Sequence, residues 1–213
     1  MLANLRLGHK YDIPDLRDRA LSHLATAYPS TLQAWDNRSK TRTFPPVMKF
    51  DLEFLLLQAA LKADACWLMP VMFYSCCSYP MREILYSVEW IGAGDLLEKH
   101  KCMLGYVDQF ASTSRVLRFL VQSPSVRCTV QLKCYEGRLA WFDMVDTWKT
   151  SIPLDIWDES DWKRFGKDVC SVCLDQSRST HRKARQAVWD NLPRTYGLPA
   201  WEDLEAHKAL ALG

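Results

Sequence analysis

The stretch Asp95–Val121, DLLEKHKCMLGYVDQFASTSRVLRFLV, sets the fold class of this chain. Its apolar residues recur three and four positions apart, which is the spacing of one face of an α-helix. They are Leu96, Leu97, Met103, Leu104, Val107, Phe110, Leu117 and Leu120. Pro124 closes the pattern, because proline cannot continue a helix. The stretch therefore predicts one long helix.

The same spacing returns on both sides of this stretch, and no segment shows the alternation of a strand. Only 8 of the 213 residues are glycine, about half the average usage, which disfavours folds rich in tight turns. The sequence predicts an all-α fold, an irregular helical bundle of roughly eight to ten helices. Further helices are expected at 12–27, 32–35, 50–62, 66–78 with a kink near Pro70, 129–149, from 160 past 173, 182–190 and 201–210, with a turn at 192–199.

Composition divides the chain into four segments. Residues 1–36 form a first helical part, and residues 37–49 form a basic loop that contains a Pro-Pro pair. Residues 50–125 form a helical subdomain. Residues 126–213 form a second helical subdomain rich in tryptophan and cysteine, since six of the nine tryptophans lie in the last third of the chain.

Charge and hydropathy bear on the kind of partner and on the location of the protein. The net charge of +2 gives no strong field for a polyanion. The N-terminus lacks the pattern of a secretory signal, and no apolar run approaches the length of a membrane span. We expect an intracellular protein, cytoplasmic or nuclear, whose eight cysteines are reduced thiols.

Motifs of several enzyme classes are missing from the sequence. It contains no GxGxxG, GxxxxGK[ST], HExxH or GxSxG pattern. The five histidines are scattered, and none belongs to a catalytic signature around a cysteine. Carboxylates cluster between Asp155 and Asp161, but they lack the spacing of a calcium loop. Such an acidic cluster is typical of the start of a helix. We therefore expect no enzymatic activity.

The cysteines form the one site-like pattern. Cys170 and Cys173 make a CxxC, whose thiols can bind a structural zinc ion if a second pair joins them. Cys128 and Cys134 are the candidates, but one continuous helix would turn their side chains about 240° apart. Sharing a metal thus requires a helix that begins after Cys128, and His181 is a possible substitute ligand. Buried core cysteines and a redox dithiol are the alternatives.

A basic stretch offers an alternative function. Nucleic-acid phosphates could bind its cations, with stacking on Trp189 nearby, whereas a solvated helix face is the ordinary interpretation. The stretch comprises Arg178, His181, Arg182, Lys183 and Arg185. A zinc-stabilised regulator that contacts nucleic acid through residues 178–185 is therefore the second functional hypothesis.

Short motifs along the chain resemble a known family. Leu5–Leu16, followed by Ala20, Leu21 and Leu24, is similar to the closing helices of a BTB (POZ) domain. The rest resembles the helical region that follows this domain in a group of fungal, basidiomycete-type proteins. The matching pieces are Tyr28–Leu32 with Trp35-Asp36, Cys128 with Cys134, Pro153–Asp155 with Trp157 and Trp162, Cys170 with Cys173, and Trp189–Pro193 with Tyr196–Trp201.

The resemblance implies a non-enzymatic protein–protein interaction module, similar to the C-terminal part of a BTB adaptor. BTB domains dimerise and dock partners, including cullin-type ubiquitin-ligase scaffolds. Met1 lies only a few residues before the BTB-like helices, so we expect residues 1–36 to be a remnant of the domain. Cullin binding is then not expected to carry over, and the protein partner is unknown.

Overall fold

The computed structural model describes residues 2–41, 49–92, 96–146 and 152–213. Within these ranges the chain forms twelve α-helices and two short 3-10 helices and no strand, which confirms the all-α class. The helices outnumber the eight to ten expected. The short helices α6 (Met81–Tyr86) and α7 (Val88–Gly92) lie in a segment for which the sequence predicted no helix.

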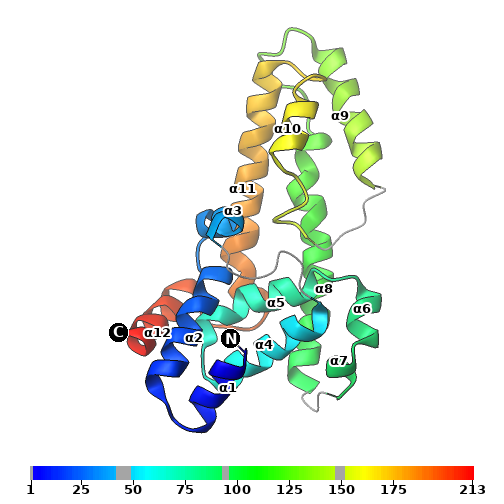
Figure 1. The fold of residues 1–213 in the computed structure, drawn as a ribbon. Coiled ribbons are helices and arrows are strands. Elements are labelled where there is room, and N and C mark those ends of the chain that lie inside the picture. Colours follow the sequence, from blue (N-terminus) through cyan, green and yellow to red (C-terminus); the bar gives the residue numbers. More distant parts are fainter. Residues whose placement is uncertain (1, 42–48, 93–95, 147–151) are drawn as a thin grey trace. The chain divides into compact units, whose positions relative to one another are not determined.

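The chain divides into two compact units, shown as ribbons in Figure 1. The first comprises Met1–Tyr106 with Asp190–Gly213, and the second comprises Val107–Trp189. This division differs from the sequence-based one at residue 125. Helices α8 (Leu96–Val116) and α11 (Ser171–Thr195) each contribute to both units, and composition cannot show that a distant segment returns to the first unit.

The first unit is built from helices at both ends of the chain. Beside α6, α7 and its parts of α8 and α11, it contains α1 (Leu2–Lys10), α2 (Pro14–Ala27), α3 (Leu32–Thr41), α4 (Phe50–Lys62), the 3-10 helix η1 (Cys66–Leu68), α5 (Met69–Cys77) and α12 (Trp201–Leu212). Helix α5 carries Pro70 in its first turn, where the missing N–H costs nothing. The kink expected near Pro70 is instead a change from η1 to α5.

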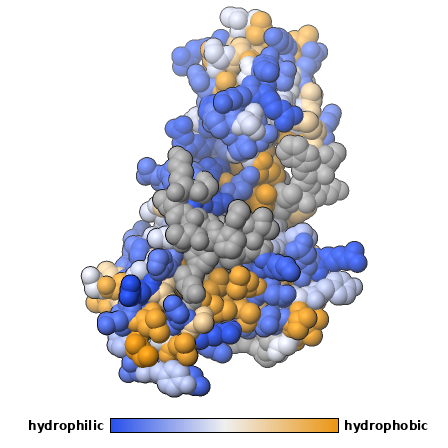
Figure 2. All heavy atoms as spheres, in the orientation of Figure 1, coloured by the Kyte–Doolittle hydropathy of each residue, from blue (hydrophilic) through white to orange (hydrophobic). Residues whose placement is uncertain are grey.

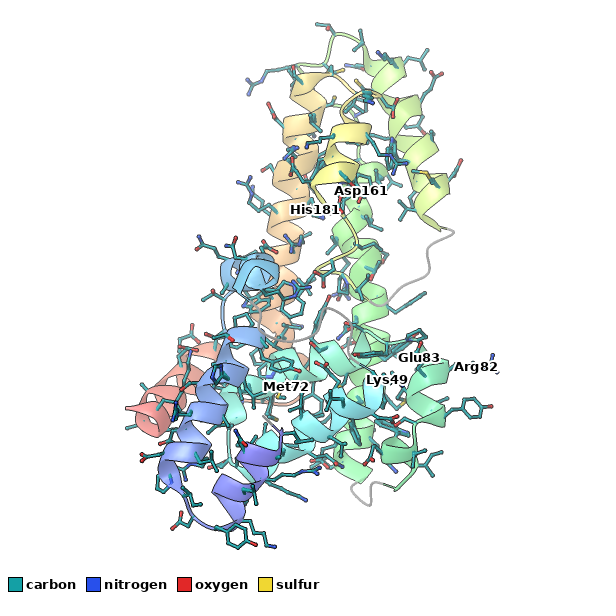
Figure 3. All side chains as sticks on the ribbon, in the orientation of Figure 1. Lys49, Met72, Arg82, Glu83, Asp161 and His181 are labelled. Carbon is teal, nitrogen blue, oxygen red and sulfur yellow. The ribbon has the colours of Figure 1, made fainter. Side chains whose placement is uncertain are left out.

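The core of the first unit is mainly apolar and contains a buried polar pair. Met72, labelled in Figure 3, is fully buried on α5. Tyr74 packs edge-on against Trp35, with ring centroids 5.4 Å apart. The Tyr28 hydroxyl donates a 2.7 Å hydrogen bond to the buried Glu53 carboxyl group, so this polar pair is satisfied.

The first part of the loop expected at residues 37–49 is helical. Helix α3 reaches Thr41, so residues 37–41 are helical and not part of a loop; residues 42–48 lie outside the described ranges. The Arg38 guanidinium stacks over the Trp35 ring, 3.5 Å from its centroid, and donates a hydrogen bond to the backbone carbonyl group of Trp35. These contacts stabilise the part of α3 that follows Trp35. The Thr31 hydroxyl accepts the Ala34 N–H and caps α3.

The turn expected at residues 192–199 begins too early. Helix α11 continues through Pro193 to Thr195, where buried Leu192 and Tyr196 face the core. Gly197, with a φ of +61°, then ends the helix. The Leu198 N–H bonds the Pro193 carbonyl group, which completes a Schellman cap.

The second unit holds most of the tryptophan-rich region. It contains the end of α8, the 3-10 helix η2 (Leu117–Leu120), α9 (Gln131–Asp146), α10 (Glu159–Phe165) and the first part of α11. Asp158 caps α10 in a capping box with Asp161, which confirms that these carboxylates mark a helix start. The continuous helix expected from residue 160 past Cys173 is wrong, because α10 ends at Phe165 and α11 begins at Ser171.

An aromatic cluster forms the core of the second unit. Phe119 is fully buried, and four rings surround it with centroids 5.0 to 5.7 Å away, those of Trp157, Trp162, Phe165 and His181. These contacts hold η2 against α10 and α11.

Figure 2 shows polar side chains over much of the viewed surface, with apolar ones in separate patches.

Candidate metal centre

Four cysteines of the second unit converge on one point. The Sγ atoms of Cys128, Cys134, Cys170 and Cys173 all lie within 4.8 Å of one another. Cys128 lies in the loop before α9, and Cys134 lies in the first turn of that helix. Helix α9 begins at Gln131, after Cys128, and so meets the condition that the sequence sets for a shared metal.

The sulfur spacing fits a tetrahedral metal. Cys128 Sγ lies 3.6 Å from Cys134 Sγ and 3.7 Å from Cys170 Sγ. Four sulfurs bound at about 2.3 Å to one ion would be about 3.8 Å apart. A disulfide requires about 2.05 Å, and all four are free thiols. The cluster therefore has the dimensions of a four-thiolate metal site.

Backbone N–H groups point at three of the sulfurs. The Cys170 N–H donates to Cys134 Sγ over 3.2 Å, and the Ser125 N–H donates to Cys173 Sγ over 3.4 Å. Cys170 Sγ accepts the N–H of Cys173. Such donors stabilise the charged sulfur, so the backbone is arranged for thiolates.

The break between α10 and α11 determines the position and the pKa of Cys170. Cys170 directly precedes α11, and its sulfur takes the position of a capping side chain. The Cys173 N–H lowers the pKa of the Cys170 thiol to about 7. Burial instead raises the pKa of Cys134 to about 12 and that of Cys173 above its usual value. A bound cation would replace these protons, because metal-coordinated thiols are deprotonated.

Arg138 is a buried cation beside the cluster that the sequence did not single out. It lies on the same face of α9 as Cys134, one turn further on, and is fully buried. Its guanidinium donates to the carbonyl groups of Ser123, at 2.9 Å, and Cys173, at 3.3 Å. Arg138 therefore connects α9 with the loop before it and with α11.

His181 lies outside the four-cysteine group. Its ring packs edge-on against Trp162 and Phe119, with centroids 5.2 and 5.6 Å away; Figure 3 labels it on α11. Burial, with a smaller effect of Arg185, lowers the pKa of His181 to about 3. The expected substitute ligand is therefore a neutral member of the aromatic core.

The basic stretch is largely occupied within the second unit. Arg178 forms a 2.7 Å ion pair with Glu159 and stacks over Trp162. Arg185 donates to the Leu154 carbonyl group. Trp189 is buried and thus has no free face for a base. Among these cations Arg182 and Lys183 are exposed.

The first unit contains a thiol–imidazole pair that the sequence did not predict. Cys66 Sγ lies 3.3 Å from His207 Nδ1, although 141 residues separate them. Burial and the negative charge of Asp64 raise the pKa of Cys66. The raised pKa favours the neutral thiol of Cys66 beside the imidazole.

Comparison with known proteins identifies no relative. No family model, no curated protein and no solved structure matches the chain. Among the described residues, no helix is both long enough and apolar enough to cross a membrane. The cysteine cluster and the helical fold are therefore the features that bear on function.

Proposed function

We propose that the protein is a non-enzymatic protein–protein interaction module whose Val107–Trp189 unit is stabilised by a structural zinc ion. The convergence of four thiol sulfurs within 4.8 Å carries the proposal. Four protein ligands fill a tetrahedral coordination sphere and leave no position for water or substrate. Such a closed site stabilises a fold and does not catalyse a reaction.

A structural site with four cysteine ligands is typical of zinc. Thiolates are soft ligands, and a tetrahedral set of four binds zinc or iron. The loop at Cys128 and the start of α11 at Cys170 are far apart in sequence, and one ion would hold both to α9. The free cysteines and the zinc site support an intracellular location, where thiols stay reduced.

The outer face of α9 supports an interaction role. Leu132, Tyr135 and Phe142 are 71%, 47% and 40% exposed and lie at the spacing of one helical stripe. The opposite flank of α9 carries Cys134 and buried Trp141 into the core. An exposed apolar stripe on a helix fixed by metal suits the docking of another protein. The resemblance of residues 1–36 to closing BTB helices supports the same function.

Metal analysis tests the zinc proposal. We expect about one zinc per purified chain, lost in Cys173→Ser because three thiolates bind zinc far more weakly than four. Cys66→Ser is the matched control, since Cys66 lies outside the cluster, and it should retain the metal. Iron in place of zinc, or a metal content unchanged by Cys173→Ser, would contradict the proposal.

Quantitative affinity purification tests the interaction role. The double variant Leu132→Ser, Phe142→Ser should lose specific protein partners that the parent chain retains. Lys133→Ser, which changes an exposed residue of the same helix outside the stripe, should retain them. An identical set of bound proteins for all three chains would exclude the α9 stripe as the docking surface.

A further inference from the structure

Arg138 occupies an environment that is unusual for a charged side chain. It is fully buried, and its two terminal nitrogens donate to five acceptors. These are the carbonyl oxygens of Gln122, Ser123 and Cys173, the Gln176 side-chain oxygen and the Ser177 hydroxyl group. All five acceptors are uncharged, and the buried Nε has no hydrogen-bond partner among the described residues, so the hydrogen bonds leave the cation without a neutralising charge.

A buried guanidinium is unfavourable unless a negative charge lies near it. Neutral acceptors recover only part of the hydration that the group loses on burial. With four protonated thiols, the cysteine cluster supplies no such charge. With four thiolates around a divalent ion, the same cluster carries a net charge of about −2.

The geometry brings that charge close to Arg138. Cys134 and Arg138 are four residues apart on α9, where side chains are neighbours about 5 to 6 Å apart at Cβ. On the other side, Arg138 Nη2 lies 3.3 Å from the carbonyl oxygen of Cys173. Two of the four clustered cysteines are therefore neighbours of Arg138, Cys134 along α9 and Cys173 through its carbonyl group.

We infer that Arg138 is the electrostatic partner of the metal centre: its buried positive charge stabilises the metal-bound four-thiolate cluster, and the cluster in turn neutralises Arg138. This inference rests on the zinc proposal. The same side chain positions the loop before α9, because it binds the carbonyl groups of Gln122 and Ser123. That loop presents the Ser125 N–H to Cys173 Sγ.

Zinc affinity, measured by competition with a chromophoric chelator, tests the role of the charge. Arg138→Gln should weaken zinc binding about 10- to 100-fold, as loss of groups around metal ligands typically does. Arg138→Lys keeps the charge without the planar fork and should recover most of the affinity. Arg178→Gln, which removes a cation paired with Glu159 on the surface, should bind zinc as the parent does.

A second pair of variants leaves Arg138 in place. Ser177→Asp puts a carboxylate beside the guanidinium, so it should compete with the cluster for Arg138 and weaken zinc binding. Ser177→Asn introduces a side chain of nearly the same size as Asp but without charge, and it should have little effect. Cobalt substitution provides the geometric control, since the sulfur-to-cobalt absorption of a four-thiolate site should persist in every variant that binds.

The outcomes separate the two proposals. If the parent chain binds no zinc, both fail. If the parent binds zinc and the Arg138→Lys and Arg138→Gln variants lose equal affinity, hydrogen bonding and not charge is responsible and only the inference fails. Equal affinities for Ser177→Asp and Ser177→Asn would also overturn it, whether or not Arg138→Gln folds.

Discussion

Cys128 Sγ and Cys170 Sγ lie 3.7 Å apart, although 42 residues separate them in the sequence. The contact joins the loop before α9 to the start of α11. Cys128 belongs to the same buried core as the aromatic side chains of the second unit, and Cys170 packs against that core. Arg138 bonds the carbonyl group of Cys173, another member of the cysteine cluster. Metal binding and core packing should therefore stabilise the second unit together.

In the zinc-free, reduced chain, Cys170 should be the first thiol to react with iodoacetamide near neutral pH. A pKa of about 7 makes about half of this thiol reactive thiolate at pH 7, against about 1% at an ordinary pKa of 9. The rate should fall as the pH drops below 7. Peptide mass spectrometry identifies the modified site, and zinc should protect it. Faster modification of partly exposed Cys66 would contradict the assignment.

The low pKa of Cys170 also makes stability depend on pH. Because the folded-state pKa lies below the unfolded value, the zinc-free fold gains stability between about pH 7 and pH 9 and loses it as the pH falls through 7. Burial gives Cys134 the opposite sign, so its contribution is lost above pH 9. The free energy of unfolding of the zinc-free chain should therefore be highest near pH 9, and denaturant unfolding at several pH values measures it. The Cys170→Ser variant should lack the rise in this free energy between pH 7 and pH 9.

His181→Phe should reduce the acid sensitivity of the zinc-free second unit. The folded state keeps His181 neutral with a pKa of about 3, whereas the unfolded chain binds a proton near pH 6.5. Stability should therefore fall by up to about 1.4 kcal/mol per pH unit below pH 6.5. The variant removes this loss and leaves no unpaired Nε2 in the core. Exposed His23→Phe is the control; an unchanged pH slope in His181→Phe would reject the explanation.

Phe119→Leu should destabilise the second unit, whereas Phe142→Leu should not. The first change removes a ring that contacts four others in the core and should cost about 1 to 3 kcal/mol. The second makes the same chemical change at a side chain that is 40% exposed, and its effect should stay within about 0.5 kcal/mol. Denaturant unfolding monitored by tryptophan fluorescence compares the two; similar losses would mean that Phe119 is not central to the core.

Gly137→Ala should destabilise the chain, although alanine favours helices by about 1 kcal/mol. A Cβ atom at Gly137 would lie 2.5 Å from the Asp168 carbonyl oxygen, so α9 would be pushed from the segment that leads to Cys170. We expect weaker zinc binding together with a lower unfolding midpoint. Gly92→Ala is the matched control, since open space surrounds that position, and should be neutral or stabilising. A neutral Gly137→Ala would show that the two segments separate easily.

Local patterns predicted most of the helices and part of the cysteine cluster. The three-and-four spacing within 96–120 corresponds to α8 and η2, and the CxxC indicated Cys170 and Cys173. The condition that the sequence sets for a shared metal, a helix that begins after Cys128, is met because α9 begins at Gln131. These inferences succeed because they depend on residues within one or two helical turns of each other.

Long-range packing produced the features that local patterns missed. The Arg138 guanidinium bonds Ser177, which is 39 residues away, and no spacing in α9 distinguishes Arg138 from a surface arginine. The break before Ser171 makes Cys170 a capping residue, and the aromatic core removes His181 from the set of ligands. Side-chain burial and the meeting of distant segments are properties of the folded chain, because they arise only when helices pack and exclude water.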